Sequence, residues 1–241
     1  MTLTGNKSGL LKRVKISEEK LRLIVRCFVA DCTALQASKI VVVNHNTTDR
    51  YFGFLRFLII KQELKERKIV MGNGIEIDES YFGPRRQRGK KGRGARKKII
   101  VLGLRKRKGK VYCEVIPDAS RNEIMPVIMQ TVKSGADIYT DGWRSYDALA
   151  VYGFNHKKVN HEKNEFVRDG TIHVNGIESF WSFAKRRLSK FNGVPKKLFT
   201  PYLLESEWRF NHRNDILKEV KKLIKNYKSN KTYSLSNLTV I

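Results

Sequence analysis

Three acidic residues occupy positions at which a rigid element would hold them. Asp78 lies inside an alternating apolar run, Asp141 ends a short apolar segment, and Glu178 opens a late helical pattern. A charge within a strand is costly unless it is paired or coordinated. Carboxylate oxygens are preferred ligands of Mg²⁺, and two ions about 3.5–4 Å apart support phosphodiester displacement. The three residues are therefore candidate metal ligands for phosphodiester chemistry.

Each acid also has a plainer interpretation that the sequence leaves open. Asp78 fits a solvated strand end, and Asp141 with the glycine after it fits an ordinary turn. Glu178 and Lys185 could form a surface ion pair on one helix, which is worth only about 0–1 kcal/mol. The choice depends on whether the elements around these residues bring them together.

The elements that must position the acids are predicted to form an α/β domain. Strands are expected at 75–82, 99–104, 111–116, 137–140 and 154–159, and helices at 120–132, 143–151, 178–188, 201–211 and 215–225. The helix near 120 is expected to open with a capping box, Ser120 to Glu123. Three strands joined by short turns suggest an antiparallel meander, and later alternation suggests parallel additions. This is the order of a ribonuclease H-like mixed sheet with flanking helices, in which the first and fourth strands are neighbours and the three acids converge.

The first 68 residues are predicted to form a small all-helical domain. Ser17 is expected to cap the first helix, Thr33 and Gln36 to form a capping box on the second, and Asn46 to cap the third. Three short helices with a tight turn before the third are typical of a helix-turn-helix, although a small packing domain would give the same pattern. In the first case the start of the third helix faces the major groove with Thr47, Thr48 and Arg50.

The composition favours a polyanionic partner. Lys and Arg number 49 against 23 for Asp and Glu, a formal net charge of +26, and basic residues that neutralise phosphates release condensed counterions. Residues 85–98 contain nine Lys or Arg and are expected to be a basic hairpin loop that contacts phosphates; its candidates are Arg85, Arg86, Arg88, Lys90, Lys91 and Arg93.

Other compositional signals exclude several classes. Three cysteines without a CxxC pair do not encode a zinc ribbon. No secretory signal and no apolar stretch of about 20 residues is found, so a cytoplasmic protein without a membrane partner is expected. The domains are predicted as 1–68 for the helix-turn-helix and linker, 69–228 for the ribonuclease H-like domain, and 229–241 for a frayed tail.

Four segments in order resemble small bacterial insertion-sequence transposases of the DDE type. They are Ile75–Gly83 (IEIDESYFG), Tyr139–Trp143 (YTDGW), His173–Trp181 (HVNGIESFW) and Glu207–Asn211 (EWRFN). The resemblance spans nearly the whole chain. Many such relatives carry an N-terminal zinc ribbon. This chain lacks the cysteine pairs that a zinc ribbon needs.

The resemblance implies a function and a set of roles. Asp78, Asp141 and Glu178 would hold two Mg²⁺ or Mn²⁺ ions, and Lys185 would be the basic residue seven positions after the glutamate. Some relatives use Asn as third ligand, for which Asn175 is the candidate. Arg186 and Arg187 would position a phosphate, and Trp181 would either stack on DNA or fill the core.

The implied partners are double-stranded DNA, as element inverted repeats and target, and further copies of the chain in a dimer or larger synaptic assembly. Two alternatives remain open: a ribonuclease H-like nuclease without strand transfer, and a non-catalytic DNA-binding regulator. The regulator explains the charge but leaves the three acids unexplained.

Overall fold

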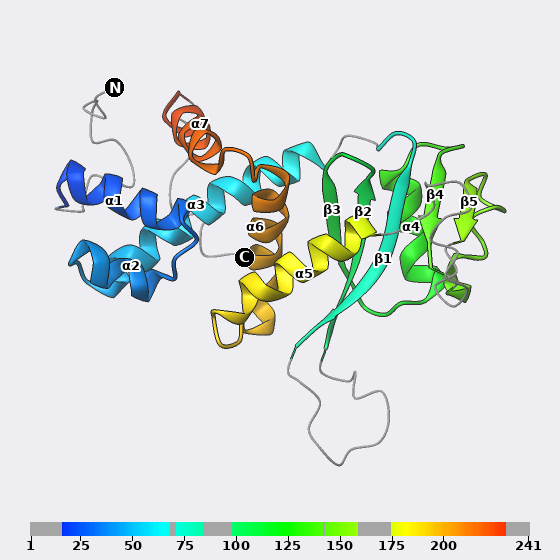
Figure 1. Cartoon of the computed structure of the whole chain (residues 1–241), viewed down its shortest axis with the longest axis horizontal. Helices are drawn as coiled ribbons and strands as arrows, with labels where there is room; N and C mark the ends of the chain where they lie inside the picture. Colours follow the sequence, from blue (N-terminus) through cyan, green and yellow to red (C-terminus); the bar gives the residue numbers. More distant parts are fainter. Residues whose placement is uncertain (1–15, 68–70, 84–97, 142, 159–174, 230–241) are drawn as a thin grey trace, which may run out of the picture. The chain divides into compact units, whose positions relative to one another are not determined.

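The computed structural model describes residues 16–67, 71–83, 98–141, 143–158 and 175–229. Its contacts divide the chain into two compact units, one made of residues 1–62 and 212–241 and the other of residues 63–211. The first unit is helical, and the second contains the sheet (Figure 1). The basic loop at 84–97, with its six candidate phosphate contacts, lies outside the described residues, as does the tail from residue 230.

The helical unit begins with two helices capped as expected. Helix α1 (Glu18–Val29) follows Ser17, whose side chain accepts a hydrogen bond from the Lys20 amide. Helix α2 (Ala34–Val41) has the reciprocal capping box of Thr33 and Gln36. Helix α3 (His45–Glu66) starts two residues earlier than expected, because Asn44 rather than Asn46 supplies the capping oxygen, at 2.8 Å from the Asn46 backbone nitrogen.

The core of this unit is aromatic and aliphatic. Phe28 of α1 meets Phe52 of α3 edge to face, with ring centroids 5.1 Å apart. The last helix, α7 (Ile216–Ser229), contacts α1 and places Tyr227 against Phe54. The structure therefore groups α7 with the N-terminal helices, whereas the sequence had suggested a single catalytic domain running to residue 228.

The second unit is built on a five-stranded mixed sheet. Strands β1 (Ile75–Phe82), β2 (Ile99–Lys106) and β3 (Val111–Ile116) form an antiparallel meander, and β4 (Asp137–Thr140) and β5 (Asn155–Lys158) add in parallel beside β1. The order is β3-β2-β1-β4-β5. This is the expected ribonuclease H-like sheet with flanking helices, so the predicted fold class is confirmed.

The two faces of the sheet carry separate cores. Helix α4 (Arg121–Thr131) covers one face, where its Ile124 and Ile128 pack with Ile77 of β1. Helices α5 (Asn175–Ser189) and α6 (Phe199–Asn211) contribute to the other core, in which Phe180 meets Phe210. Alternation along β1 sends odd-numbered residues to the α4 side and even-numbered residues to the α5 side.

Two local expectations in this unit were wrong. Ser120 precedes α4 but makes no side-chain cap; instead its backbone N–H donates to Asp118 at 2.8 Å. The segment expected to be helical at 143–151 contains one short 3₁₀ helix, Arg144–Tyr146, followed by turns. Short apolar runs are compatible with both helices and turns, so periodicity alone does not distinguish them.

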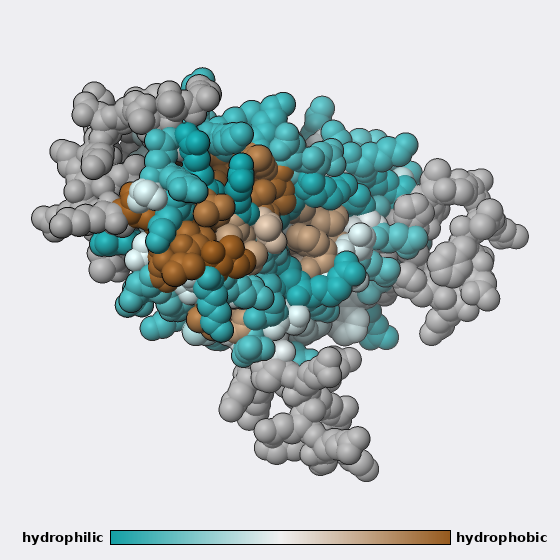
Figure 2. Space-filling view, turned by 60° about the vertical axis from the view of Figure 1, so that its left-hand side comes forward, coloured by the Kyte–Doolittle hydropathy of each residue, from teal (hydrophilic) through white to brown (hydrophobic). Residues whose placement is uncertain are grey.

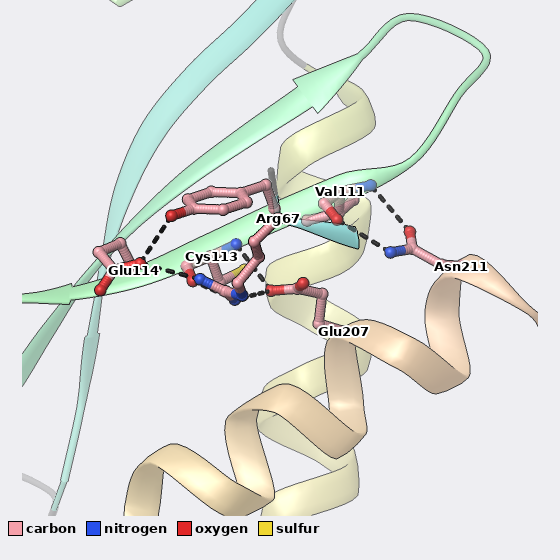
Figure 3. Close-up of polar contacts among 7 residues, drawn as sticks. Arg67, Val111, Cys113, Glu114, Glu207 and Asn211 are labelled. Atoms are coloured by element: carbon pink, nitrogen blue, oxygen red, sulfur yellow. Dashed lines mark hydrogen bonds and ion pairs between the residues drawn. The ribbon is translucent and has the colours of Figure 1, made fainter. Parts of the chain in front are cut away.

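Side chains form hydrogen bonds with backbone N–H and C=O groups at the outer edge of β3 (Figure 3). The Asn211 amide accepts from the Val111 N–H at 2.8 Å and donates to the Val111 carbonyl at 2.9 Å. The Glu207 carboxylate accepts from the Cys113 N–H, and Arg67 donates to the Cys113 carbonyl. Unpaired strand edges invite association with other strands, so α6 both holds the sheet and closes this edge.

The surface of the helical unit is partly apolar. Figure 2, which turns this part of the molecule forward, shows hydrophobic side chains grouped within a mostly hydrophilic surface. The exposed large hydrophobic residues of the unit include Leu35, Ile40 and Val42, on or beside α2. Two exposed basic residues, Lys39 and Arg50, are nearby in sequence. Among the described residues, no helix has the length and apolar character needed to span a membrane.

Candidate active site

Strands β1 and β4 bring two of the predicted acids level with each other. Ile75 pairs with Ile138 and Glu76 with Tyr139 in the parallel ladder. The same offset places Asp78 opposite Asp141, which directly follows β4. Asp78 shares its face of β1 with Phe82, and Tyr139 of β4 packs in the same core as Phe82, on the α5 side. Both acids therefore belong to the face that α5 covers.

Asp78 is a largely buried carboxylate with a fixed orientation. Its Oδ2 accepts from the Trp181 indole N–H at 3.0 Å, and its Oδ1 accepts from the Glu79 backbone N–H at 2.8 Å. Burial raises the pKa of Asp78 to about 6, the Trp181 hydrogen bond opposes that rise, and the negative charges of Asp141 and Glu178 add to it. Asp141 and Glu178 thus lie near enough for their charges to act on Asp78.

Glu178 depends for its position on the start of α5, and a buried acid of β1 fixes that start. Glu76 is 1% exposed, and its Oε2 accepts from the Ile177 backbone N–H at 2.9 Å. A carboxylate at a helix N-terminus satisfies an unpaired amide and opposes the positive end of the helix dipole. Arg105 and Arg107 approach the same carboxylate at 3.6 and 3.5 Å. Sequence analysis missed Glu76, although two acids on one face of an otherwise apolar strand were the available signal.

Two glycines permit the close approach of α5 to the sheet. A Cβ at Gly103, the β2 residue opposite Asp78, would collide with the Trp181 ring. A Cβ at Gly176 would collide with the Arg105 guanidinium and the Glu76 carboxylate. The first glycine leaves room for the indole that orients Asp78, and the second leaves room for the acid that holds the helix. Neither position was predicted from the sequence.

A fourth acid lies on the other face of β1. Burial raises the pKa of Glu79 to about 7; its neighbour Tyr146 opposes this rise, and the charges of Asp78 and Asp141 strengthen it. Glu79 follows the odd-numbered residues toward the α4 side, where Tyr146 is buried. It is a partly buried acid close to the site but on the opposite face from α5.

The basic candidates on α5 fall into two groups. Lys185 and Arg186 are exposed, and the Lys185 Nζ lies 5.8 Å from the centre of the Phe82 ring. Arg187 is 4% exposed, forms an ion pair with Glu205 and donates to Ser206. Arg187 is therefore corrected from a DNA-contacting residue to a structural one, because its guanidinium is enclosed by α6.

For Trp181 the structure favours the second of its two expected roles, packing in the core. The indole is 5% exposed, and its N–H is used by Asp78. It contacts Phe180 and Phe82 within the core, so it cannot present a face to a base. Asn175, the candidate alternative ligand, is the exposed first residue of α5.

The candidate base-contacting residues of the helical unit differ in exposure. Arg50 is exposed and Thr47 is partly exposed at the start of α3. Thr48 is fully buried, and its hydroxyl donates to the carbonyls of Ala34 and His45 at 2.9 and 2.8 Å. Thr48 therefore joins α2 to α3 and is removed from the candidate base contacts.

The donor chemistry of the acids fits a hard divalent cation. Asp78 is buried, oriented and without an ion pair among the described residues, a combination that is costly unless a cation compensates it. However, within the described ranges no three His, Cys, Asp or Glu side chains are gathered closely enough to hold an ion. Like charges repel one another at the short separations that shared metal ligation requires. The three acids are therefore near enough for Asp141 and Glu178 to act on Asp78, but they are not drawn together as ligands of one ion.

Comparison with known proteins places the sequence of this region in a family. A model of the ISXO2-like transposase domain matches residues 70–211, more than half of the chain. An uncharacterized transposase-like protein of Haemophilus influenzae is 45% identical over 105 residues, covering 44% of this chain and 84% of the relative. An uncharacterized protein in transposable element ISH50 of Halobacterium salinarum is 37% identical over 146 residues, covering 54% of this chain and 49% of the relative.

Solved structures give a more distant likeness. A Mos1 transposase paired-end complex with left transposon end has a TM-score of 0.30 at 10% identity, with 90% of this chain and 82% of that chain covered. The Mos1 strand transfer complex has a TM-score of 0.28 at 12% identity, with 89% and 80% covered.

Proposed function

This chain belongs to the ISXO2-like transposases, which are insertion-sequence transposases of the DDE type, and from that premise we propose that it cuts the ends of an insertion sequence and joins them to target DNA. The observation that carries the proposal is the arrangement around Asp78. This acid is largely buried, its Oδ2 accepts a hydrogen bond from Trp181, and it lies level with Asp141. The charge of Glu178, on a helix whose start contacts Glu76, acts on its carboxylate.

Each residue has a role in the proposed chemistry. Asp78, Asp141 and Glu178 would hold two Mg²⁺ or Mn²⁺ ions. When bound, such ions activate the attacking oxygen and stabilise the leaving 3′ oxygen of an in-line displacement. Trp181 keeps one Asp78 oxygen in a fixed direction, and the rigid strands limit misplacement, which at about 1 Å can cost roughly a hundredfold in rate. Lys185 and Arg186 would contact the phosphates that flank the scissile bond.

The proposed partner is double-stranded DNA. A net charge of +26 supports strong sequence-independent attraction to phosphates. The exposed Arg50 and the partly exposed Thr47 stand at the start of a helix that follows a short turn, which is where recognition helices contact base edges. Two element ends have to be joined, so we expect a dimer or larger assembly on DNA.

Replacement of the acids by their amides tests the chemistry. Asp78→Asn and Asp141→Asn should each abolish Mg²⁺-dependent cutting of DNA that carries the element end and leave DNA binding nearly intact, because a neutral amide is a poorer ligand for a hard cation. Asp118→Asn, an exposed acid before α4, is the matched control and should cut at the wild-type rate. Wild-type cutting by both site variants would overturn the proposal. Cutting without joining in a strand-transfer assay would identify a nuclease instead.

A further inference from the structure

Two cysteines meet at the turn that ends helix α1. The Cys32 backbone N–H donates to the Cys27 carbonyl at 3.0 Å, and the Asp31 N–H donates to the Phe28 carbonyl at 3.0 Å. Asp31 has a positive φ of 59°. Two such hydrogen bonds around a left-handed residue form the Schellman motif, in which the side chains at the positions of Cys27 and Cys32 frequently contact each other. The motif therefore places one thiol beside the other.

The separation of these cysteines suits a disulfide. A backbone hydrogen bond of 3.0 Å between two residues keeps their Cα atoms inside the range of about 4.4–6.8 Å that disulfides span. The thiols themselves also interact. Burial raises the pKa of the Cys27 thiol, and the charge and the hydrogen bonding of the Cys32 thiol raise it further. The folded turn thus holds the two sulfurs near each other before any bond forms between them.

The two thiols differ in their access to solvent. Cys27 is 7% exposed, whereas Cys32 is partly exposed. A solvent-accessible thiol is the first to be oxidised, and a second thiol within reach converts its sulfenic acid into a disulfide. The third cysteine, Cys113, is 1% exposed on β3 of the other unit, so it serves as an internal control.

We propose that Cys27 and Cys32 are a redox modification site, which a peroxide converts into a reversible disulfide. The Cys32 thiolate attacks one peroxide oxygen, which gives a sulfenic acid and, with a proton, the first water. The Cys27 sulfur then displaces the hydroxyl group from the Cys32 sulfur, which forms the S–S bond and releases the second water. The two thiols lose the electron pair that the peroxide gains.

This bond would join two helices of the helical unit. Cys32 directly precedes Thr33, the residue that caps α2, so the disulfide would tie the end of α1 to the start of α2. The inference goes beyond the proposed function and does not depend on it.

Peptide mapping measures the bond directly. The full-length protein is treated with hydrogen peroxide in a chelating buffer, its free thiols are alkylated in denaturant, and the chain is cut with trypsin. Trypsin cleaves after Arg26 and next after Lys39, so one peptide, 27–39, contains both cysteines. We expect this peptide to lose two hydrogen atoms, to escape alkylation, and to recover both free thiols in dithiothreitol. Alkylation of both cysteines after the treatment, or a sulfinic acid at Cys32 in place of the bond, would overturn the inference.

Single variants identify the two partners. Cys27→Ser and Cys32→Ser should each abolish the disulfide, while Cys113→Ser should leave it unchanged. A bond between two chains, or one that includes Cys113, would contradict the assignment.

Thermal stability gives a second readout. A bond that fits the folded turn restricts mainly the unfolded chain, so the oxidised wild type should melt a few degrees above the reduced protein. Cys32→Ser, treated in the same way, should melt at the same temperature as before the treatment. An oxidised wild type that melts below the reduced protein would show that the bond strains the turn, and the proposed site would be rejected.

Discussion

At the scale of single residues, the charged carboxylate of Asp78 lowers the free energy of unfolding, because burial disfavours its ionised form. Its pKa of about 6, against an ordinary value of 3.8, means that folding takes up a proton between these values. The folded protein binds more protons than the unfolded one in this window, so this group makes the free energy of unfolding fall as the pH rises from about 4 to about 6. A site that gathers negative charge is expected to behave in this way.

Asp78→Asn should therefore stabilise the metal-free protein at pH 8 and give no gain at pH 4. The pKa difference sets a ceiling of about 3 kcal/mol, at about 1.4 kcal/mol per pH unit. An amide cannot accept from both Trp181 and the Glu79 N–H, so a gain of about 1–2 kcal/mol is expected after the loss of one hydrogen bond. Thermal melting in a chelator from pH 4 to 8 measures it. The exposed control Asp118→Asn should show no such gain at pH 8; a site variant less stable than wild type at pH 8 would contradict the prediction.

At the scale of elements, the site depends on how α5 meets the sheet. Glu76 accepts from the first turn of the helix, Gly176 leaves space for that carboxylate and Arg105, and Gly103 leaves space for the indole that orients Asp78. Glu178 and Lys185 project from the helix that these contacts fix. Glu76 is accordingly a positioning residue, with no contact to the reacting groups.

Substitutions at Glu76 should change metal affinity as well as stability. Glu76→Gln keeps an oxygen for the Ile177 N–H but removes the charge facing Arg105 and Arg107, so a loss of about 1–3 kcal/mol is expected. Glu76→Ala should lose the cap as well and raise the Mg²⁺ concentration that half-saturates cutting, with partial rescue in Glu76→Gln. Titration of cutting activity with Mg²⁺ measures this effect.

The matched control is Glu114→Gln. Glu114 is also an acid of the sheet that pairs with an arginine, Arg67 at 2.8 Å, but it lies on β3. It should lower stability without changing the Mg²⁺ requirement. An unchanged Mg²⁺ requirement in folded Glu76→Ala would show that Glu76 has a structural role alone.

At the scale of the whole molecule, two kinds of DNA contact are expected from different segments. The nine basic residues of 85–98 are expected to contact phosphates whatever the base sequence, while Arg50 stands at a helix start. Neutralising several of the loop residues should weaken binding to all sequences alike and reduce the salt slope by about 0.9 for each phosphate that the loop no longer neutralises. Competition between end-containing and scrambled duplexes, repeated over a range of salt, separates the two effects.

Arg50→Ala should instead reduce the preference for element ends, by about 1–3 kcal/mol if the guanidinium contacts a guanine, and leave the salt slope nearly unchanged. Thr48→Ser is a useful comparison, because it keeps the buried hydroxyl that joins α2 to α3 and should preserve the preference. An equal end preference in wild type and Arg50→Ala would exclude Arg50 as the base reader.

The sequence by itself determined the elements and their class. Alternation marked β1 and the capping residues marked α1 and α2, because these signals depend on neighbours within a few positions. The mixed sheet followed from the order of strands and helices. The EWRFN segment carries a family motif in its sequence. Its hydrogen bonds to the β3 edge, however, are made to Val111 and Cys113, about a hundred positions earlier.

Only the tertiary structure decided which side chains meet. Thr48, Trp181 and Arg187 have residue types suited to DNA contact, yet burial assigns all three to packing and positioning. Gly103 gave no chemical signal of its own, and Glu76 gave only its place beside Asp78 on one face of an otherwise apolar strand. The roles of both residues exist only when α5 lies against the sheet. Burial and the distance between remote segments are properties of the packed chain, and for that reason local pattern predicts the strand that carries Asp78 but not the residues that hold its carboxylate in place.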